Sequence, residues 1–531
     1  MLALMLMLTM QTECDFRVIE GRIELPTGTH EAVAIARGKV REVGKASDMP
    51  SVPATCRTRL ADDQTAFPGL TDSHVHLLGI GLREMTLNLD SARSVEDVKR
   101  ALARTAEEQP EGAIIGRGWI ETGWPEGRAL DRRDLDEIVS DRPVLLTRAD
   151  GHAMAVNTAT LEAAGIDADT EDPEGGRIVR DADGQATGYL IDYAMDLVMP
   201  LMPELDVERR REALRLGAET YASRGWTSVH NMSVDGEDLP LLKELAAAGE
   251  LPLRVANFVT RDAMGTVIEE GPGCDATGLV CNLGVKFYAD GALGSRGALL
   301  KEPYSDEPAT IGLRLLTKDD AMGVYREAAS NGLQITTHAI GDQANDDILS
   351  WYGELREDFP KAVLRIEHAQ IVDPVDLDRF ASTGVIASMQ PSHAIGDLHF
   401  APERLGMERL RGAYAWNSLA GEGTLIVFGS DAPVEQGDPR IELYAAHVRQ
   451  DLEGFSGEGW HPEEALSRAE ALALFTTSPA LSIGRGGSIG TLAPGFAADL
   501  SIFEGDPFAG PSQARAVATM INGRWVSGEA Q

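Results

Sequence analysis

His74 and His76 lie two residues apart, shortly after an apolar run at residues 66–70. If that run is a buried strand, alternate side chains face the same side, so both imidazoles point the same way at its C-terminal end. Imidazoles are common ligands of divalent metals, and Asp72 is placed to orient one of the two rings. The pair supplies half of a metal site if other segments bring partners, and it is a chance surface pair if they do not.

Later segments end in residues of the types that hold divalent metals. In chain order these residues are Lys286, His338, His368 and Asp431. Nitrogen and carboxylate ligands without a thiolate suit Zn²⁺ or a similar divalent ion. Any one of them alone could be a core or helix-capping residue. Their occurrence at the ends of successive predicted strands favours a shared metal site.

Short apolar runs alternate with helical patterns through the middle of the chain, which is typical of a parallel sheet. The eight runs are residues 66–70, 228–231, 253–258, 283–288, 333–337, 363–366, 385–389 and 425–428. Eight such strands predict an α/β fold of the (β/α)8 TIM-like barrel type. Active sites of these barrels form at the C-terminal ends of the strands, where the candidate ligands are expected.

Two parts of the chain do not fit a simple barrel. Residues 82–206 are far longer than one crossover and contain strand and helix candidates of their own. We therefore expect an insertion after the first barrel strand, large enough to cap the barrel mouth. Short β-rich segments at both ends predict a small β-sandwich domain built from residues 1–65 and 485–531. The barrel, with its insertion, then occupies residues 66–484.

The composition indicates an acidic enzyme with a sizeable core. The formal net charge is −36 and the pI is near 4.6, while 43% of the residues are hydrophobic. This charge argues against nucleic acid or an anionic membrane as a partner, so we expect a small-molecule substrate. Salt in a halophilic cytoplasm would screen such self-repulsion. A GC-rich genome encoding an ordinary acidic enzyme explains the composition equally well.

The cysteines and the N-terminus bear on the location of the protein. The chain has four cysteines and no Cys-x-x-Cys spacing: Cys14, Cys56, Cys274 and Cys281. We therefore expect no disulfide framework, and a reducing compartment fits. The apolar residues 1–10 make a poor signal peptide and are too short to span a membrane, and a start codon further downstream would explain them as well. We expect a soluble, cytoplasmic protein.

Several motifs are specific enough to compare with known families. They are residues 68–76, 285–296, 337–342, 367–370, 429–434 and 490–500, with residues 143–146, 150–152 and 156–157 in the insertion. Together they resemble the amidohydrolase superfamily, in the branch of YtcJ-like and AepA-like metal-dependent hydrolases that also includes N-substituted formamide deformylases. The resemblance runs over residues 14–526. It is specific for fold and metal chemistry and poor for substrate.

The resemblance implies two divalent ions, Zn²⁺ or another metal, held by His74, His76 and Asp431 at the more buried position and by His338 and His368 at the second. Lys286 would be carbamylated, which turns a cation into a carboxylate that bridges the two ions. A surface or salt-bridged lysine is the alternative for Lys286. Asp431 would also be the catalytic residue, taking a proton from a metal-activated water and delivering it to the leaving nitrogen.

Five further residues are candidates for substrate binding: His393, His152, Arg296, Trp119 and Trp124. His393 follows the seventh predicted strand, resembles a substrate-site histidine of the family, and could donate a hydrogen bond to a developing oxyanion. A loop histidine is the alternative. His152 and the two tryptophans lie in the insertion and could line the substrate pocket. Arg296 could bind a substrate carboxylate.

These observations predict a metal-dependent amidohydrolase that cleaves a non-peptide C–N bond in an amide, an N-acyl or N-formyl compound, or a cyclic amide. A lyase or isomerase that uses the same metal site is one alternative, because a fold does not determine its chemistry. A regulatory or binding protein of the AepA type is another, although the ligand set is complete. Dimers are common among such barrels, so we consider a homodimer, but the sequence identifies no interface.

Overall fold

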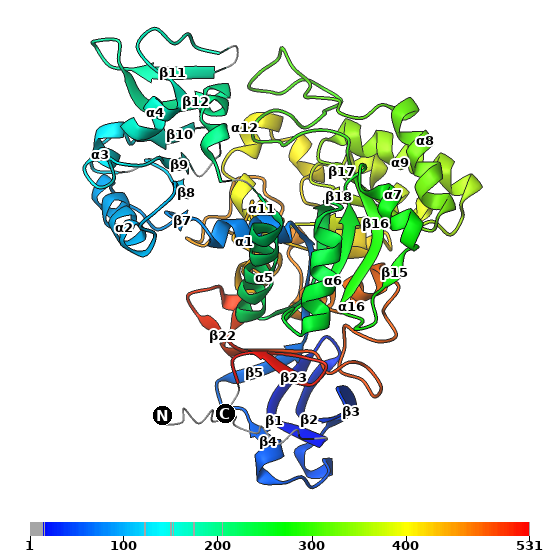
Figure 1. Ribbon diagram of the computed structural model, residues 1–531. Coiled ribbons are helices and arrows are strands. Elements are labelled where there is room, and N and C mark those ends of the chain that lie inside the picture. Colours follow the sequence, from blue (N-terminus) through cyan, green and yellow to red (C-terminus); the bar gives the residue numbers. More distant parts are fainter. Residues whose placement is uncertain are drawn as a thin grey trace, which may run out of the picture. The chain divides into compact units, whose positions relative to one another are not determined.

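The computed structural model (Figure 1) describes residues 14, 16–121, 124–148, 151, 153–173, 176–203 and 205–529. The chain forms two compact units. One joins Met1–Leu77 to Ala218–Gln531, and the other is Leu78–Gly217. The first unit contains a parallel barrel and a smaller sheet, and the second has a sheet of its own.

The barrel is built from eight parallel strands in the order β20-β19-β18-β17-β16-β14-β13-β6. Their bounds are β6 (Leu70–Val75), β13 (Trp226–Val234), β14 (Arg254–Val259), β16 (Val280–Tyr288), β17 (Gln334–Ala339), β18 (Leu364–His368), β19 (Ile386–Met389) and β20 (Ile426–Phe428). A parallel bridge between Val75 and Ala432 links the first strand to the segment after the last. The predicted α/β fold with a parallel eight-stranded barrel is confirmed.

Helices connect the barrel strands, as the βα pattern of the sequence predicts. They are α5 (Val207–Arg224), α6 (Asp238–Ala248), α7 (Met264–Glu270), α8 (Lys318–Ser330), α9 (Asp342–Asp358), α10 (Leu377–Thr383), α11 (Pro391–Asp397), α12 (Ala401–Leu405) and α13 (Trp416–Gly421), followed by α14 (Pro439–Val448), α15 (Arg468–Leu474) and α16 (Thr477–Ser482). Helix α8 begins after Thr317, whose side chain accepts the N–H of Asp320. Among the described residues, no helix is both long enough and apolar enough to cross a membrane.

The first barrel strand differs from the prediction. Residues 66–70 were expected to form it, but β5 (Gln64–Pro68) belongs to the small sheet and the barrel strand begins at Leu70. Gly69 separates the two strands, and its N–H donates to the carbonyl of Asp499. A Cβ atom at Gly69 would lie 2.4 Å from Thr227 Oγ1, so no larger residue fits this close passage without a shift. The apolar run continues through both strands, which is why the sequence pattern did not divide them.

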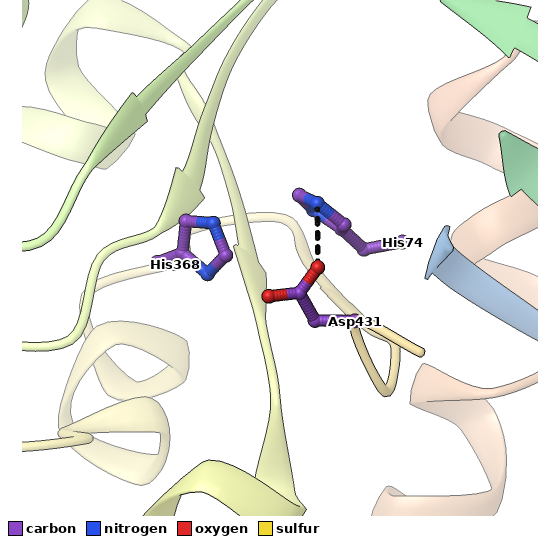
Figure 2. Close-up of side chains that lie close together, drawn as sticks. All are labelled: His74, His368 and Asp431. Carbon is purple, nitrogen blue, oxygen red and sulfur yellow. Dashed lines mark ion pairs between the residues drawn. The ribbon is translucent and has the colours of Figure 1, made fainter. Parts of the chain in front are cut away.

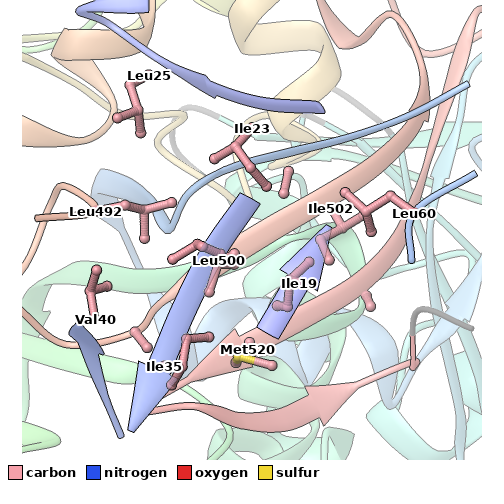
Figure 3. Packing of buried hydrophobic residues seen from close by; sticks show 14 residues of the cluster. Ile19, Ile23, Leu25, Ile35, Val40, Leu60, Leu492, Leu500, Ile502 and Met520 are labelled. Carbon is pink, nitrogen blue, oxygen red and sulfur yellow. The ribbon is translucent and has the colours of Figure 1, made fainter. Parts of the chain in front are cut away.

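Strands from both ends of the described chain form the small sheet, in the order β23-β22-β21-β5-β1-β2-β3, with β4 beside β1 (Figure 1). The strands are β1 (Phe16–Leu25), β2 (Gly28–Ala36), β3 (Lys39–Gly44), β4 (Arg57–Arg59), β5, β21 (Leu500–Gly505), β22 (Ala514–Ile521) and β23 (Arg524–Ser527); β15 (Gly273–Cys274) lies against β16 of the barrel. Figure 3 shows the apolar cluster on this sheet, in which Ile19 and Ile23 of one end meet Leu500 and Ile502 of the other. These strands are hydrogen-bonded into a single sheet. The predicted β-sandwich domain stays a prediction.

The second unit is built on a six-stranded sheet in the order β11-β12-β10-β9-β8-β7. Its elements are β7 (Leu87–Asn88), β8 (Ile114–Trp119), β9 (Val144–Arg148), β10 (Ala153–Val156), β11 (Gly176–Arg180) and β12 (Ala186–Asp192), with helices α1 (Leu77–Glu84), α2 (Val95–Glu108), α3 (Arg132–Asp136) and α4 (Thr158–Ala164). Side chains of β9 alternate between two apolar clusters: Val144 and Leu146 pack into one and Leu145 into the other. Both faces of this sheet are therefore covered.

Short 3₁₀ helices complete the described elements. They are η1 (Ala46–Asp48), η2 (Ala54–Cys56), η3 (Tyr193–Leu197), η4 (Met199–Leu201), η5 (Pro374–Asp376), η6 (Arg409–Gly412), η7 (Pro462–Glu464) and η8 (Pro507–Ala509).

The cysteines are paired, which corrects the expectation that the chain has no disulfide framework. Cys14 is bonded to Cys56, and Cys274 is bonded to Cys281, so no cysteine is left free among the described residues. Cys274 and Cys281 occupy directly opposite positions on β15 and β16. Pairing depends on this register and not on spacing along the sequence. The cysteines therefore no longer support a reducing compartment, and a cytoplasmic location stays a prediction.

A buried ion pair joins the barrel to the small sheet. Arg254 of β14 donates to both carboxylate oxygens of Asp499, at 2.7 and 3.1 Å. Asp499 also accepts the N–H of Asn522 at 2.8 Å, and both charged side chains are almost fully buried. Truncating one partner of such a pair leaves an uncompensated buried charge, which costs much more than losing an exposed pair.

We therefore predict that Asp499→Ala lowers the free energy of unfolding by about 3–5 kcal/mol. Glu504→Ala is the matched control, because Glu504 lies on β21, which Asp499 directly precedes, and pairs with Arg515 at the surface. Its loss should cost less than about 1 kcal/mol. Thermal unfolding of both variants beside the native protein measures the difference. Equal shifts in Tm would contradict a structural role for the Arg254–Asp499 pair.

Candidate metal centre

The C-terminal ends of the barrel strands bring together the predicted histidines and Asp431. His74 belongs to β6, His338 to β17 and His368 to the end of β18, while Asp431 follows β20. His74 Nε2 lies 3.4 Å from Asp431 Oδ1, and His76 Nε2 lies 3.2 Å from the same oxygen. Figure 2 shows His74, His368 and Asp431 facing one another across this end of the barrel.

Three of these side chains converge closely enough to hold one cation. Ligand atoms of His74, His368 and Asp431 all lie within 4.8 Å of one another, and the three residues are buried. His74 Nε2 and Asp431 Oδ1 have no hydrogen-bond partner. Buried polar atoms without partners are costly, so their convergence fits a divalent ion that would satisfy them.

His76 and His338 lie beside this group. His76 contacts Asp431 as described, and the ring of His338 lies 4.5 Å from that of His368, measured between centroids. His338 Nε2 is buried without a hydrogen-bond partner and lies 3.3 Å from Asp290 Oδ1. The structure thus gathers the four predicted histidine ligands and Asp431 at this end of the barrel.

Two of the imidazoles are held in a defined tautomer. His74 Nδ1 lies 2.6 Å from Glu367 Oε2, and His368 Nδ1 lies 2.9 Å from Gln390 Oε1. Both acceptors are oxygens, so each Nδ1 carries the proton and each Nε2 offers a lone pair to a metal. Burial, reinforced by the charge of Lys286, lowers the pKa of His74 to about 4, so its imidazole is neutral at neutral pH. Neutral imidazole is the form that binds metals.

Lys286 projects from β16 into the same region. It is almost fully buried, and its Nζ lies 4.9 Å from the centre of the Tyr288 ring. Burial lowers the pKa of Lys286 to about 8, although the nearby carboxylates Glu367 and Asp431 oppose this shift. A lysine in this setting keeps a substantial neutral fraction in mildly alkaline solution.

Glu367 is a site residue that the sequence analysis did not identify. It is fully buried and accepts hydrogen bonds from His74, from Arg365 Nε at 2.8 Å and from the hydroxyl of Thr336. Burial alone would raise the pKa of Glu367, but Arg365 and His74 bring it well below its usual range, so it is ionised. The sequence signal was a charged residue directly after the predicted strand at residues 363–366, next to the ligand His368.

The backbone conformation at His368 explains why the side chains of both Glu367 and His368 reach the metal centre. Side chains of consecutive strand residues normally face opposite ways, so strand alternation alone would put Glu367 and His368 on different sides. His368 has φ +77° and Ala369 has φ +44°, values that residues other than glycine rarely adopt. This turn at the strand end brings His368 within 4.8 Å of the His74 ring, while Glu367 bonds the same ring directly. Asp431 also has a positive φ, +63°.

The sequence analysis expected Asp72 to orient an imidazole, but Asp72 bonds other groups. Its carboxylate accepts the backbone N–H of His74 at 3.2 Å, the N–H of Ser430 at 2.9 Å and the hydroxyl of Ser430 at 2.6 Å. These bonds join β6 to the segment after β20. Asp72 therefore positions the backbone on either side of the metal centre, and Glu367 orients the ring of His74.

Comparison with known proteins agrees with this geometry. The model of the family described as "Amidohydrolase family" matches residues 61–527. The chain belongs to the amidohydrolase family. It is 34% identical to the putative amidohydrolase YtcJ of Bacillus subtilis, over 93% of this chain and 96% of that protein. It is 25% identical to the N-substituted formamide deformylase of Arthrobacter pascens, with 90% of each chain covered.

A solved structure resembles this amidohydrolase over nearly its whole length. An uncharacterized metal-dependent hydrolase from Pyrococcus furiosus superimposes with a TM-score of 0.74 at 28% identity, covering 93% of this chain and all of that one. The family and its YtcJ-like branch, predicted from the motifs, are confirmed. Family membership and the metal-dependent relatives support hydrolase activity.

Among the predicted substrate-binding residues that the structure describes, His393 lies at the metal centre. His393 Nε2 lies 3.7 Å from Asp431 Oδ2 and 3.7 Å from Glu435 Oε1, and its ring is parallel to that of His368. Arg296 pairs instead with Asp306 at 2.8 Å, so its charge is already balanced. His152 lies outside the described residues.

Trp119 and Trp124 lie in an apolar core of the second unit, and their part in substrate binding stays a prediction. Both belong to one buried cluster of the second unit, and Trp119 donates its Nε1–H to the carbonyl of Leu146 at 2.8 Å. Aromatic side chains supply large buried areas, and this packing role accounts for both residues. The sequence alone could not distinguish a buried tryptophan from one that lines a pocket.

We predict that Glu367→Gln weakens metal binding by about 10–100-fold, because groups that orient a metal ligand typically contribute this much. Glu354→Gln is the control, since Glu354 is about 40% exposed and pairs with Lys318. Zinc titration of metal-free protein, with circular dichroism to check the fold, measures the change. Unchanged affinity in a folded Glu367→Gln protein would show that Glu367 does not position His74.

Proposed function

We propose that this protein is a metal-dependent amidohydrolase that cleaves a C–N bond in a small amide, an N-acyl or N-formyl compound, or a cyclic amide. One observation carries the proposal: His74, His368 and Asp431 converge at the C-terminal end of the barrel with buried atoms that lack partners. Active sites of such barrels occupy this end. Relatives named as an amidohydrolase and a formamide deformylase support the type of bond.

The side chains fit a pair of divalent ions, for which Zn²⁺ is the first candidate because the donors are nitrogen and oxygen. In the proposed arrangement His74, His76 and Asp431 would hold one ion, and His338 and His368 would hold the second. A carbamate on Lys286 would bridge them, which the burial of this lysine beside the centre supports. When bound, such ions lower the pKa of a water molecule and polarise a substrate carbonyl.

The protein's own groups would perform the remaining steps. Burial alone would raise the pKa of Asp431, but the nearby imidazoles of His74, His76 and His368 hold it well below its usual range. The carboxylate is therefore ionised and could accept a proton from the attacking water. It would then return this proton to the leaving nitrogen, as a general acid. His393, 3.7 Å from Asp431, would donate a hydrogen bond to the substrate oxygen as negative charge develops there.

Isotope incorporation tests hydrolysis directly. In ¹⁸O-labelled water, the carboxylic product of each N-formyl, N-acyl or cyclic-amide substrate should gain one ¹⁸O atom per turnover. We expect Asp431→Asn to lower kcat/KM by about 10²–10⁴-fold through loss of proton transfer. Asp358→Asn, which removes a surface partner of Arg326, should leave kcat/KM unchanged. Turnover without label in the product would indicate a lyase or isomerase.

The metal content of a Lys286 variant tests the proposed bridge. Protein purified in bicarbonate should contain close to two divalent ions per chain by elemental analysis, and Lys286→Ala should contain about one, because the bridging carboxylate is lost. Lys361→Ala, at an exposed position, is the control and should retain the native content. The same content in Lys286→Ala and the native protein would contradict the bridge.

A further inference from the structure

A pocket lies in the barrel unit, beside the metal centre. Its volume is about 230 Å³, and its wall is formed by α11, α14 and the segments that follow β20 and α14. Four carboxylates line it: Glu435, Glu442, Asp451 and Glu453. His399 is the only basic residue among the described residues of its wall, and no lysine or arginine contributes. The pocket is therefore strongly acidic.

Glu442 is the carboxylate that indicates a ligand. Its side chain is buried, with 1% of the residue exposed, and lines the pocket from α14. Oε2 accepts the backbone N–H of Ser392 at 3.1 Å, but Oε1 has no hydrogen-bond partner. A buried carboxylate oxygen without a partner is costly, and a bound donor would remove that cost.

The other acidic side chains differ in what they offer a ligand. Asp451 is already bonded, to His399 Nε2 at 3.0 Å and to the backbone N–H groups of Glu453 and Phe455. Glu442 is the most deeply buried of the four, while the side chain of Glu435 is 31% exposed. Burial raises the pKa of both Glu435 and Glu442, and the charges of Asp72 and Glu435 raise that of Glu442 further. A positive charge between them would stabilise both carboxylates.

One imidazole connects this pocket to the metal centre. Ser392 of the pocket wall precedes His393 in the chain, and His393 Nε2 lies 3.7 Å from both Glu435 Oε1 and Asp431 Oδ2. A substrate whose scissile bond lies at Asp431 would therefore reach the pocket within a few bonds. The side chain of His399 in the pocket wall is 54% exposed, so the pocket reaches the surface there.

We propose that this pocket binds a cationic group of the substrate, an alkylammonium or a guanidinium, while the scissile C–N bond lies at the metal centre. This inference rests on the proposed function and narrows it to amides that carry a positive charge. The pocket has room for several non-hydrogen atoms, since a water molecule takes up about 30 Å³. Its carboxylates do not converge as the metal ligands do: among the described residues only His74, His368 and Asp431 form such a group.

Matched substrates test the preference. An N-formyl or N-acyl diamine with a free terminal ammonium is compared with the analogue in which a hydroxyl group replaces the ammonium. We expect kcat/KM of the native holoenzyme to favour the cationic substrate by about 10–100-fold, the effect of one or two charge-assisted hydrogen bonds. Glu442→Gln should reduce this ratio to nearly one. Glu422→Gln, at an exposed position away from the pocket, should preserve it.

Direct binding separates this inference from the proposed function. Calorimetric titration of the holoenzyme with butylammonium should show binding that weakens at least tenfold in Glu442→Gln, and Glu435→Gln provides a second variant if Glu442→Gln does not fold. Equal hydrolysis of the cationic and neutral substrates would overturn the inference and leave the proposed function standing. Butylammonium binding without hydrolysis of either substrate would support the pocket and overturn the function. Neither binding nor hydrolysis would overturn both.

Discussion

Closure of the parallel barrel is the constraint on which the metal centre depends. The N–H of Asp431 donates to the carbonyl of His74 at 2.7 Å, and the N–H of His76 donates to the carbonyl of Ala432 at 2.8 Å. Asp72 and Ser430, 358 residues apart, strengthen the same junction. These bonds place a carboxylate from the end of the chain against two imidazoles from its beginning. Without this junction, His74 and Asp431 would have no fixed separation.

Burial then determines the electrostatics of the assembled group. The ionised Glu367 is sustained inside the barrel by Arg365, so that the Nδ1 proton of His74 has a fixed acceptor and Nε2 remains available. Isolated buried charges are costly, and this pair exists only because each member neutralises the other. The same low-polarity surroundings lower the pKa of Lys286 and leave the atoms that face the centre without partners. A dication is the natural complement of such a group.

The sequence predicted the parts of the site that follow from periodicity and chain order. His74, His338, His368 and Asp431 each lie at the end of a predicted barrel strand, and parallel strands must bring such ends together. Glu367 was missed because strand alternation assigns it to the side opposite His368, and only the positive φ of His368 removes that difference. No local pattern in the sequence signals a backbone turn of this kind.

Other misses share a physical cause: they depend on contacts between distant segments. The apolar run around Pro68 contributes residues to two different sheets. The break between them at Gly69 depends on contacts with Asp499 and Thr227, which are distant in the sequence. The pairing of Cys14 with Cys56 depends in the same way on tertiary structure.

The central claim is that the end of the barrel is a metal centre built from these side chains. Anomalous diffraction from crystals grown with zinc, measured on either side of the zinc absorption edge, tests it most directly. The account predicts one peak next to His74, His76 and Asp431 and a second peak next to His338 and His368. Zinc bound elsewhere, with no peak among these side chains, would contradict it.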